Sequence, residues 1–224
     1  SLVLVPLVAS LGAKVVKMSG RGLGHTGGTI DKLESIMGFK TELPEHEFLR
    51  IANEIGCCVV GQTGTLVPAD KRLYALRDVT STVDSIPLIA SSIMSKKLAG
   101  GADAIVLDVK LGSGALMKTV EDCIELSKTM VEIGERNGRR VIALVTGMQE
   151  PLGSHIGNAL EVKEAVDVLA GRTKGPLLEL SLTLGEYMLM ASKLAKTNGE
   201  AREMLEHALD SGMGLDKLRE MVEA

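Results

Sequence analysis

Aromatic side chains are scarce in this 224-residue chain, which has two Tyr, two Phe and no Trp. Proteins that bind single-stranded nucleic acid stack the bases on aromatic side chains, and nucleic-acid-binding surfaces are usually basic. Here the net charge is −4 and the pI is about 5.7. The composition therefore argues against nucleic acid as a partner. Hydrophobic residues make up 45% of the chain, so a core of Leu, Ile, Val, Ala and Met can form.

Cysteines are few, and Cys57, Cys58 and Cys123 do not follow a metal-binding spacing. Cys57 and Cys58 are adjacent in an apolar run, so we expect small buried thiols of the kind found in a reducing cytoplasm. The four histidines lack the spacing of a zinc site.

No apolar run is long enough to span a membrane. The apolar start has neither a basic segment nor a clear cleavage site, which predicts a cytoplasmic protein without a signal peptide. The chain begins without Met inside an apolar run, which suggests a fragment.

Short apolar runs alternate with longer amphipathic ones as far as Gly147, and the chain beyond it is predicted to be helical. The apolar runs are rich in Val and Ile with little polar alternation, which is typical of strands covered on both faces. This order predicts an α/β fold with a mainly parallel sheet flanked by helices. Strands are expected at residues 13–18, 57–62, 104–110 and 141–146, and helices at 44–55, 68–77, 87–98, 119–137, 158–169, 176–196, 200–210 and 215–222.

The most informative segment, residues 17–34, has five glycines between Gly20 and Gly28. It follows a predicted strand and leads into a predicted helix. Glycines let backbone N–H groups turn toward one point, while hydroxyls and the cations Lys17 and Arg21 add donors and positive charge. The segment lacks the end of a Walker A loop and the dinucleotide fingerprint Gly-x-Gly-x-x-Gly. It therefore predicts a site for phosphate or another anion, with a flexible surface loop as the alternative.

Three further polar sets have both a structural and a functional interpretation. The loop at residues 110–118 is either an ordinary strand-to-helix turn or part of a ligand crevice at the carboxyl ends of strands. Ser92 and Lys96 share a helix face, which is either solvated or able to hydrogen-bond a planar polar ligand. Glu161 and Glu164, near a predicted helix start, are either surface acids favoured by the helix dipole or ligands of a hard cation.

Residues 17–35 closely resemble the signature of the thymidine and pyrimidine-nucleoside phosphorylases. Other segments resemble the same family at residues 60–64, 68–78, 84–97, 108–110 and 157–164. The resemblance covers essentially the whole chain, and it is closer to the bacterial pyrimidine-nucleoside branch than to phosphoribosyltransferases of related fold. It implies an α/β phosphate-binding catalytic domain at residues 1–67 and 101–224. Residues 68–100 would be a helical segment belonging to a small α domain.

The resemblance also implies roles for individual residues. Phosphate would be held by Ser1, Lys17, Ser19 and Thr29. The pyrimidine would be contacted by Arg77, Ser92 and Lys96. Arg77 and Lys96 are the implied catalytic residues, because their positive charge would offset charge on the departing base. A monovalent cation, usually potassium in bacterial members, would be bound by backbone carbonyls of Leu152 and His155 and by the carboxylate of Glu164.

The implied reaction is phosphorolysis, in which phosphate attacks the anomeric carbon of a pyrimidine (deoxy)nucleoside and the free base leaves. Phosphate is then the co-substrate, no organic cofactor is needed, and the parent protein is a homodimer. Relatives carry an earlier loop, Lys-His-Ser-Thr-Gly-Gly-Val-Gly-Asp, and a C-terminal α+β portion that these 224 residues lack. We therefore expect a chain truncated at both ends, an active parent enzyme and little activity from the 224 residues alone. The alternatives are a non-catalytic phosphate-binding scaffold and a phosphoribosyltransferase of related fold.

Overall fold

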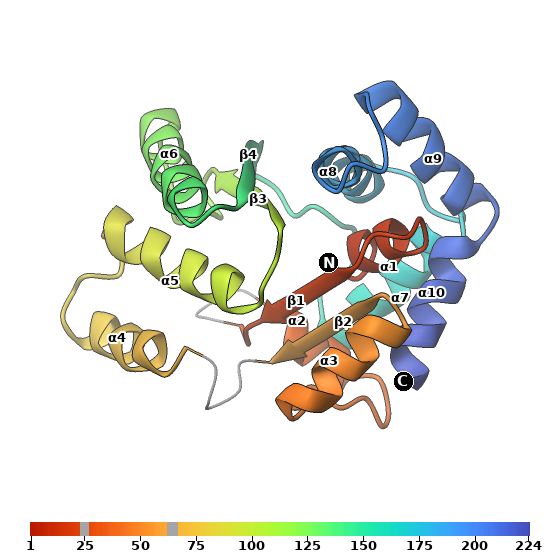
Figure 1. The fold of residues 1–224 in the computed structure, drawn as a ribbon, viewed down its shortest axis with the longest axis horizontal. Helices are drawn as coiled ribbons and strands as arrows, with labels where there is room; N and C mark the ends of the chain where they lie inside the picture. Colours follow the sequence, from red (N-terminus) through yellow and green to blue (C-terminus); the bar gives the residue numbers. More distant parts are fainter. Residues whose placement is uncertain (23–26, 62–66) are drawn as a thin grey trace. The chain divides into compact units, whose positions relative to one another are not determined.

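The structure, a computed structural model, describes residues 1–22, 27–61 and 67–224 (Figure 1). The chain divides into two compact units, residues 1–63 with 152–224 and residues 64–151. Each unit has one pair of parallel strands and a hydrophobic core of its own. The predicted α/β class and the parallel pairing are confirmed, with the described strands forming two two-stranded sheets. The assignment of residues 68–100 alone to a helical domain stays a prediction.

The first unit is built around strands β1 (Val15–Ser19) and β2 (Cys57–Gly61), which pair in parallel with Ser19 opposite Gly61. Every residue of β2 is buried, as its continuous apolar sequence predicts. The helices of this unit are α1 (Leu4–Ala9), α2 (Thr29–Glu34), α3 (Glu45–Glu54), α7 (Asn158–Leu169), α8 (Pro176–Ala191), α9 (Asn198–Asp210) and α10 (Met213–Glu223). Its core includes the fully buried side chains of Leu7, Leu169, Leu189 and Leu205.

Two features of the first unit differ from the prediction. Helix α1 was not expected, because five of its six residues are buried and it has no polar face to give a helical period. Helix α8 ends at Ala191, whereas the sequence predicts a helix to residue 196. The reason is the left-handed conformation of Lys193, with φ of 62°. Helices commonly end at such a residue, but it is usually glycine, so the sequence carries no signal for this end.

The second unit pairs strand β3 (Ala104–Leu111) in parallel with β4 (Arg140–Gly147). Its helices are α4 (Pro68–Val79), α5 (Ile86–Ala99) and α6 (Val120–Arg136). The fully buried side chains of Met94, in α5, and Cys123, in α6, belong to its core. Thr119 caps α6, since its hydroxyl accepts a hydrogen bond of 3.1 Å from the backbone N–H of Asp122.

The described part of the chain contains no helix that is both long and apolar enough to cross a membrane.

All three thiols are free and buried, as predicted for Cys57 and Cys58. Burial raises the pKa of the Cys57 thiol to about 11 and that of Cys58 to about 12. Burial also raises the pKa of Cys123. The thiolate is the reactive form, and at pH 8 only about 0.1% of a thiol with a pKa of 11 is ionised. We therefore expect iodoacetamide to label no cysteine of the folded chain at pH 8, and all three after unfolding in guanidinium chloride. Mass spectrometry counts the labels, and rapid labelling of the folded chain would contradict the expectation.

Candidate active site

The carboxylate of Asp31, in α2, binds both described sides of the glycine loop. Its Oδ2 atom accepts hydrogen bonds from the backbone N–H groups of Gly22 (2.7 Å) and Gly28 (3.2 Å). Gly28 also packs directly against the Arg21–Gly22 peptide, where a Cβ would overlap backbone atoms. The loop therefore closes at a point that only glycine fits. Residues 23–26, with two of the loop's polar side chains, His25 and Thr26, lie outside the described residues.

The residues expected to hold phosphate lie around the carboxyl end of β1. Lys17 and Ser19 belong to β1 and are partly buried, and the ammonium of Lys17 donates a hydrogen bond to the hydroxyl of Ser1. Thr29 is the first residue of α2. The backbone N–H of Ile30, the residue after Thr29, lies 3.5 Å from the carbonyl oxygen of Gly20, which follows Ser19. The structure thus brings Ser1 to Lys17 and the two described sides of the loop to each other.

Arg21 differs from its predicted contribution of free positive charge to the loop. Its guanidinium is paired with two carboxylates of α2, Asp31 at 3.1 Å and Glu34 at 2.6 Å. The pKa of Glu34 is lowered mainly by its hydrogen bond from Arg21. The pKa of Asp31 is lowered mainly by its hydrogen bond from the backbone N–H of Gly22. Because both acids stay ionised, they neutralise Arg21. The charge of Arg21 is therefore already balanced within the protein.

The residues expected to contact a pyrimidine belong to the second unit, where α5 brings two of them together. The Nζ atom of Lys96 donates hydrogen bonds to the hydroxyl of Ser92 (2.8 Å) and to the Asp70 carboxylate (2.7 Å). Ser92 and Asp70 are both buried, with 7% and 9% of their surface exposed. The helix face that the sequence left open between solvent and ligand therefore carries a partly buried ammonium held by two partners. The neighbouring Lys97 has a lowered pKa because of burial and the charge of Lys96.

Arg77, in the last turn of α4, is also buried, with 7% of its surface exposed. Its Nε donates to the carbonyl oxygen of Thr82 at 3.4 Å, and a terminal nitrogen donates to the carbonyl oxygen of Val83. A buried guanidinium needs such acceptors, because leaving its N–H groups without partners is costly. These contacts fix Arg77 against the connection between α4 and α5. Asp70 is the functional candidate that the sequence reasoning missed, although it lies within a segment that resembles the family.

The residues expected to bind a cation also come together, within the first unit. Glu164, in α7, is 4% exposed, and its carboxylate accepts hydrogen bonds from the backbone N–H groups of Ser154 (2.6 Å) and His155 (3.2 Å). A Cβ at Gly153 would overlap the same carboxylate, so the segment that contains Leu152 and His155 wraps closely around it.

Among the described residues, the neighbours of the Glu164 carboxylate are backbone N–H groups and the His155 ring. Its carboxylate lies 3.7 Å from Nδ1 of His155, which is buried and has no hydrogen-bond partner among the described residues. Three or more His, Cys, Asp or Glu side chains arranged to hold a metal ion do not occur in the described part of the chain. A buried carboxylate is an oxygen ligand of the kind that a hard cation prefers, whereas zinc is usually bound by Cys and His side chains.

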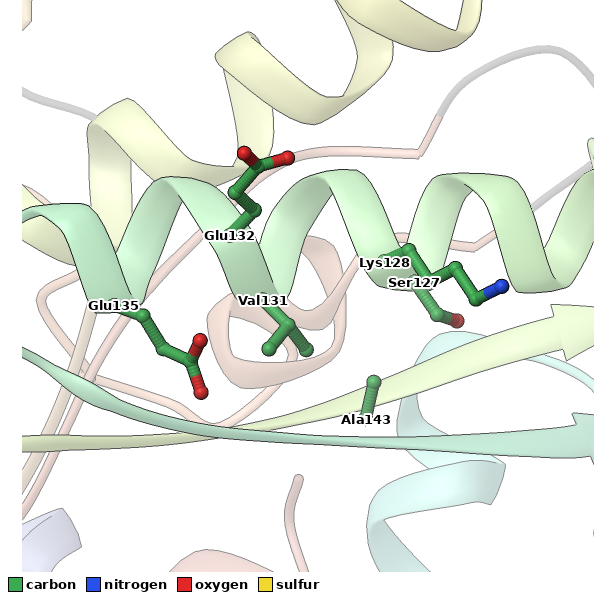
Figure 2. Close-up of a pocket in the computed structure, with 6 residues that line it drawn as sticks. All are labelled: Ser127, Lys128, Val131, Glu132, Glu135 and Ala143. Atoms are coloured by element: carbon green, nitrogen blue, oxygen red, sulfur yellow. The ribbon is translucent and has the colours of Figure 1, made fainter.

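A shallow groove in the second unit lies between α6 and β4 (Figure 2). Ser127 and Val131 point from α6 toward the strands (Figure 2). The groove is lined by Ser127, Lys128, Val131, Glu132, Glu135 and Ala143. None of the residues expected to bind phosphate, pyrimidine or cation is among them, so this groove is not the candidate site.

Comparison with known families identifies the chain. A family model described as "Glycosyl transferase family, a/b domain" matches residues 1–215. The chain belongs to this glycosyl transferase family. The match spans both compact units. It therefore includes the glycine loop, the Lys96 cluster (Lys96 with Ser92 and Asp70) and the Glu164 segment (Glu164 with residues 152–155).

Individual relatives of this glycosyl transferase domain confirm the resemblance seen in its sequence. It is 60% identical over 222 residues to the pyrimidine-nucleoside phosphorylase of Bacillus subtilis (strain 168), covering 99% of this chain and 51% of that protein. It is 58% identical over 223 residues to the pyrimidine-nucleoside phosphorylase of Staphylococcus haemolyticus (strain JCSC1435), covering 100% of this chain and 52% of that protein. The chain thus spans about half the length of the curated relatives it matches.

A solved structure supports the fold of the glycosyl transferase domain. The crystal structure of anthranilate phosphoribosyltransferase from Thermus thermophilus superimposes with a TM-score of 0.70 and 20% sequence identity. The superposition covers 100% of this chain and 72% of that one. At this identity the likeness concerns the fold, and it says nothing about the substrate.

Proposed function

We propose that this chain is the phosphate-binding and base-binding part of a pyrimidine-nucleoside phosphorylase. The observation that carries the proposal is the 60% identity to the Bacillus subtilis phosphorylase across 99% of this chain. In the proposed reaction a phosphate oxygen attacks the anomeric carbon of a pyrimidine (deoxy)nucleoside. A C–O bond forms, the C–N glycosidic bond breaks, and the base leaves with the bonding electrons and takes up a proton. The products are the free pyrimidine and (deoxy)ribose 1-phosphate.

The phosphate would be bound by the ammonium of Lys17, the hydroxyls of Ser1, Ser19 and Thr29, and backbone N–H groups. The ammonium is a charged donor and the others are neutral, and all of them suit a phosphate oxyanion. Hydrogen bonds from a charged donor such as Lys17 are the stronger kind. Lys17 and Ser1 already contact each other, which supports a shared ligand for them. A phosphate held in one orientation is a more effective nucleophile, because the entropy of bringing the reactants together is lost on binding instead of in the transition state.

The base would be bound by Lys96, Ser92 and Arg77. An ammonium has three N–H donors, and the described partners of Lys96 are Ser92 and Asp70. The third N–H group can therefore donate to a carbonyl oxygen of the pyrimidine. As the glycosidic bond breaks, negative charge develops on the base, and the charges of Lys96 and Arg77 stabilise it. Such donors, fixed in place before the reaction, are usually the largest contribution to catalysis.

Potassium is the cation we propose for the Glu164 segment, bound by the carboxylate and by the carbonyl oxygens of Leu152 and His155. Bound there, it would supply positive charge to a buried carboxylate and hold the segment at residues 152–155 in place.

We propose no organic cofactor. The free, buried cysteines support a cytoplasmic protein, and we propose a homodimer for the full-length protein, which light scattering after gel filtration can test.

Potassium should raise the thermal stability of the full-length protein, and Glu164→Gln should abolish that effect. At potassium roughly tenfold above its dissociation constant, ligand linkage predicts an increase in Tm of about 1.5 °C for a protein about twice the length of this chain. The measurement is a thermal scan in potassium chloride and in tetramethylammonium chloride at equal ionic strength. Glu161→Gln, which removes a carboxylate from the same helix, is the control and should keep the shift. An equal Tm in both salts for the unchanged protein would contradict the potassium site.

The proposed reaction is tested with the full-length protein, thymidine or uridine, and phosphate. We expect free base and sugar 1-phosphate in equal amounts, no turnover without phosphate, and little turnover by the 224 residues alone. Chromatography of the products measures both. Phosphate binding without turnover would favour a binding scaffold, and product formation only with phosphoribosyl pyrophosphate would favour a phosphoribosyltransferase.

A further inference from the structure

We propose that Arg21 is a positioning residue, which holds the glycine loop in place through Asp31 and Glu34 and does not bind phosphate itself. The inference rests on the proposed function, because it concerns how the phosphate-binding loop is held. The sequence pattern alone counts Arg21 with Lys17 as positive charge near an anion site.

Both terminal nitrogens of the Arg21 guanidinium are hydrogen-bonded to carboxylates of α2. One terminal nitrogen lies 3.1 Å from Asp31 and 2.6 Å from Glu34, and the other donates to the second oxygen of Glu34 at 2.8 Å. The pair with Glu34 is therefore bidentate, which fixes orientation as well as distance. Arg21 thus joins the start of the loop to both acids of α2.

Asp31 carries this restraint into the loop backbone. Its other oxygen accepts the N–H groups of Gly22 and Gly28 at 2.7 and 3.2 Å. These two N–H groups point at Asp31, so they are not directed at an external anion. They instead fix the residues on each side of the loop, and Arg21 holds the carboxylate that does so.

Glu34 connects the loop to the strands. It accepts a hydrogen bond of 2.8 Å from the hydroxyl of Thr41, which is 4% exposed. The carbonyl oxygen of Thr41 accepts the backbone N–H of Gly61 at 2.7 Å, and Gly61 is the β2 partner of Ser19. A continuous set of contacts thus runs from Arg21 to the residue opposite Ser19. Binding groups need this kind of support to keep their geometry within a fraction of an ångström.

The two possible roles of Arg21 predict opposite effects for Glu34→Gln. If Arg21 bound phosphate, this change would release the guanidinium from Glu34 and remove a nearby negative charge, so phosphate would bind as well or more tightly. If Arg21 positions the loop, the same change breaks the bidentate pair, and phosphate binds more weakly despite the gain in positive charge.

The experiment compares Arg21→Gln, Glu34→Gln and Arg21→Lys with the matched pair Arg50→Gln and Glu47→Gln in the full-length protein. Arg50 makes a similar bidentate pair with Glu47 on α3, at 3.0 and 2.7 Å, outside the loop. Calorimetry gives the Kd of inorganic phosphate, and steady-state kinetics give the two KM values. We expect Arg21→Gln and Glu34→Gln each to weaken phosphate binding about tenfold, with the nucleoside KM changed less than about twofold. Arg21→Lys should restore part of the loss, and the control pair should bind phosphate normally.

Several results would overturn the proposal. Normal or tighter phosphate binding by Glu34→Gln would make Arg21 a ligand, and normal binding by Arg21→Gln would leave it no role. Equal losses in the control pair would make the effect a general one of surface ion pairs. Arg21 and Glu34 are partly exposed, and such pairs contribute little to stability, so we expect folded variants with a Tm near that of the unchanged protein. If the unchanged protein binds no phosphate at all, the proposed function fails, which is distinct from a failure of the variants alone.

Discussion

Replacing Lys96 with glutamine in the full-length protein should lower kcat/KM for pyrimidine nucleosides by about 10²- to 10³-fold. Glutamine is of similar length and can still hydrogen-bond to Ser92, but it carries no charge to stabilise the departing base. It also removes the ammonium that pairs with the buried Asp70 carboxylate at 2.7 Å. Steady-state kinetics with both substrates varied measure the loss, which should appear in kcat with little change in the KM of phosphate.

Two variants test whether that loss belongs to the Lys96 cluster. Asp70→Asn keeps the charge of Lys96 but weakens its orientation, and should lower kcat/KM by about tenfold. Lys128→Gln removes an exposed lysine of α6, in the same unit, and should leave kcat/KM unchanged. A Lys96→Gln enzyme with at least half of the normal kcat/KM would remove Lys96 from the proposed mechanism.

The sequence predicts contacts within one helix better than contacts between helices. Ser92 and Lys96 are four residues apart, so the helical period alone places them on one face, and the structure joins them at 2.8 Å. Asp70 lies in α4 and Lys96 in α5. Their pairing depends on how the two helices pack, which no local pattern encodes.

The fold follows the same division between local and packed features. Continuous Val-rich and Ile-rich runs predicted all four described strands, because burial on both faces leaves a clear apolar signature. Helix α1 left no periodic signature, since it is buried nearly all round. The alternation of strands and helices predicted that the strands run parallel. It did not predict that β1 pairs with β2 and β3 with β4.

The glycine loop shows where composition misleads. Counting Lys17 and Arg21 as positive charge treats the loop as if it were isolated. Asp31 and Glu34 are three residues apart on α2, so both can face the same guanidinium. That spacing was the available signal. The charge of Arg21 is therefore balanced by the two acids of α2.

Gly28→Ala should weaken phosphate binding by the full-length protein by about 10²-fold, because displacement of catalytic groups by about 1 Å has effects of this size. The backbone of Gly28, with φ of −90° and ψ of 149°, is allowed for alanine. The obstacle is steric, since the new Cβ would overlap the Arg21–Gly22 peptide. That peptide cannot retreat without breaking the hydrogen bonds that Gly22 and Gly28 donate to Asp31. Calorimetric titration with phosphate measures the loss.

Gly27→Ala separates this steric effect from a general sensitivity of the loop to side chains. A Cβ at Gly27 would meet Lys32 Cε at 3.4 Å and Glu161 Oε1 at 3.8 Å, both at the ends of flexible side chains. These ends can move, so phosphate binding should weaken less than about threefold. Gly199→Ala, in α9 with open space around it, should have no effect. Equal losses at Gly27 and Gly28 would mean that the whole loop requires flexibility. Normal binding at Gly28 would mean that the loop can open at Arg21 without losing its phosphate geometry, and the close approach would then be a packing detail without a role in binding.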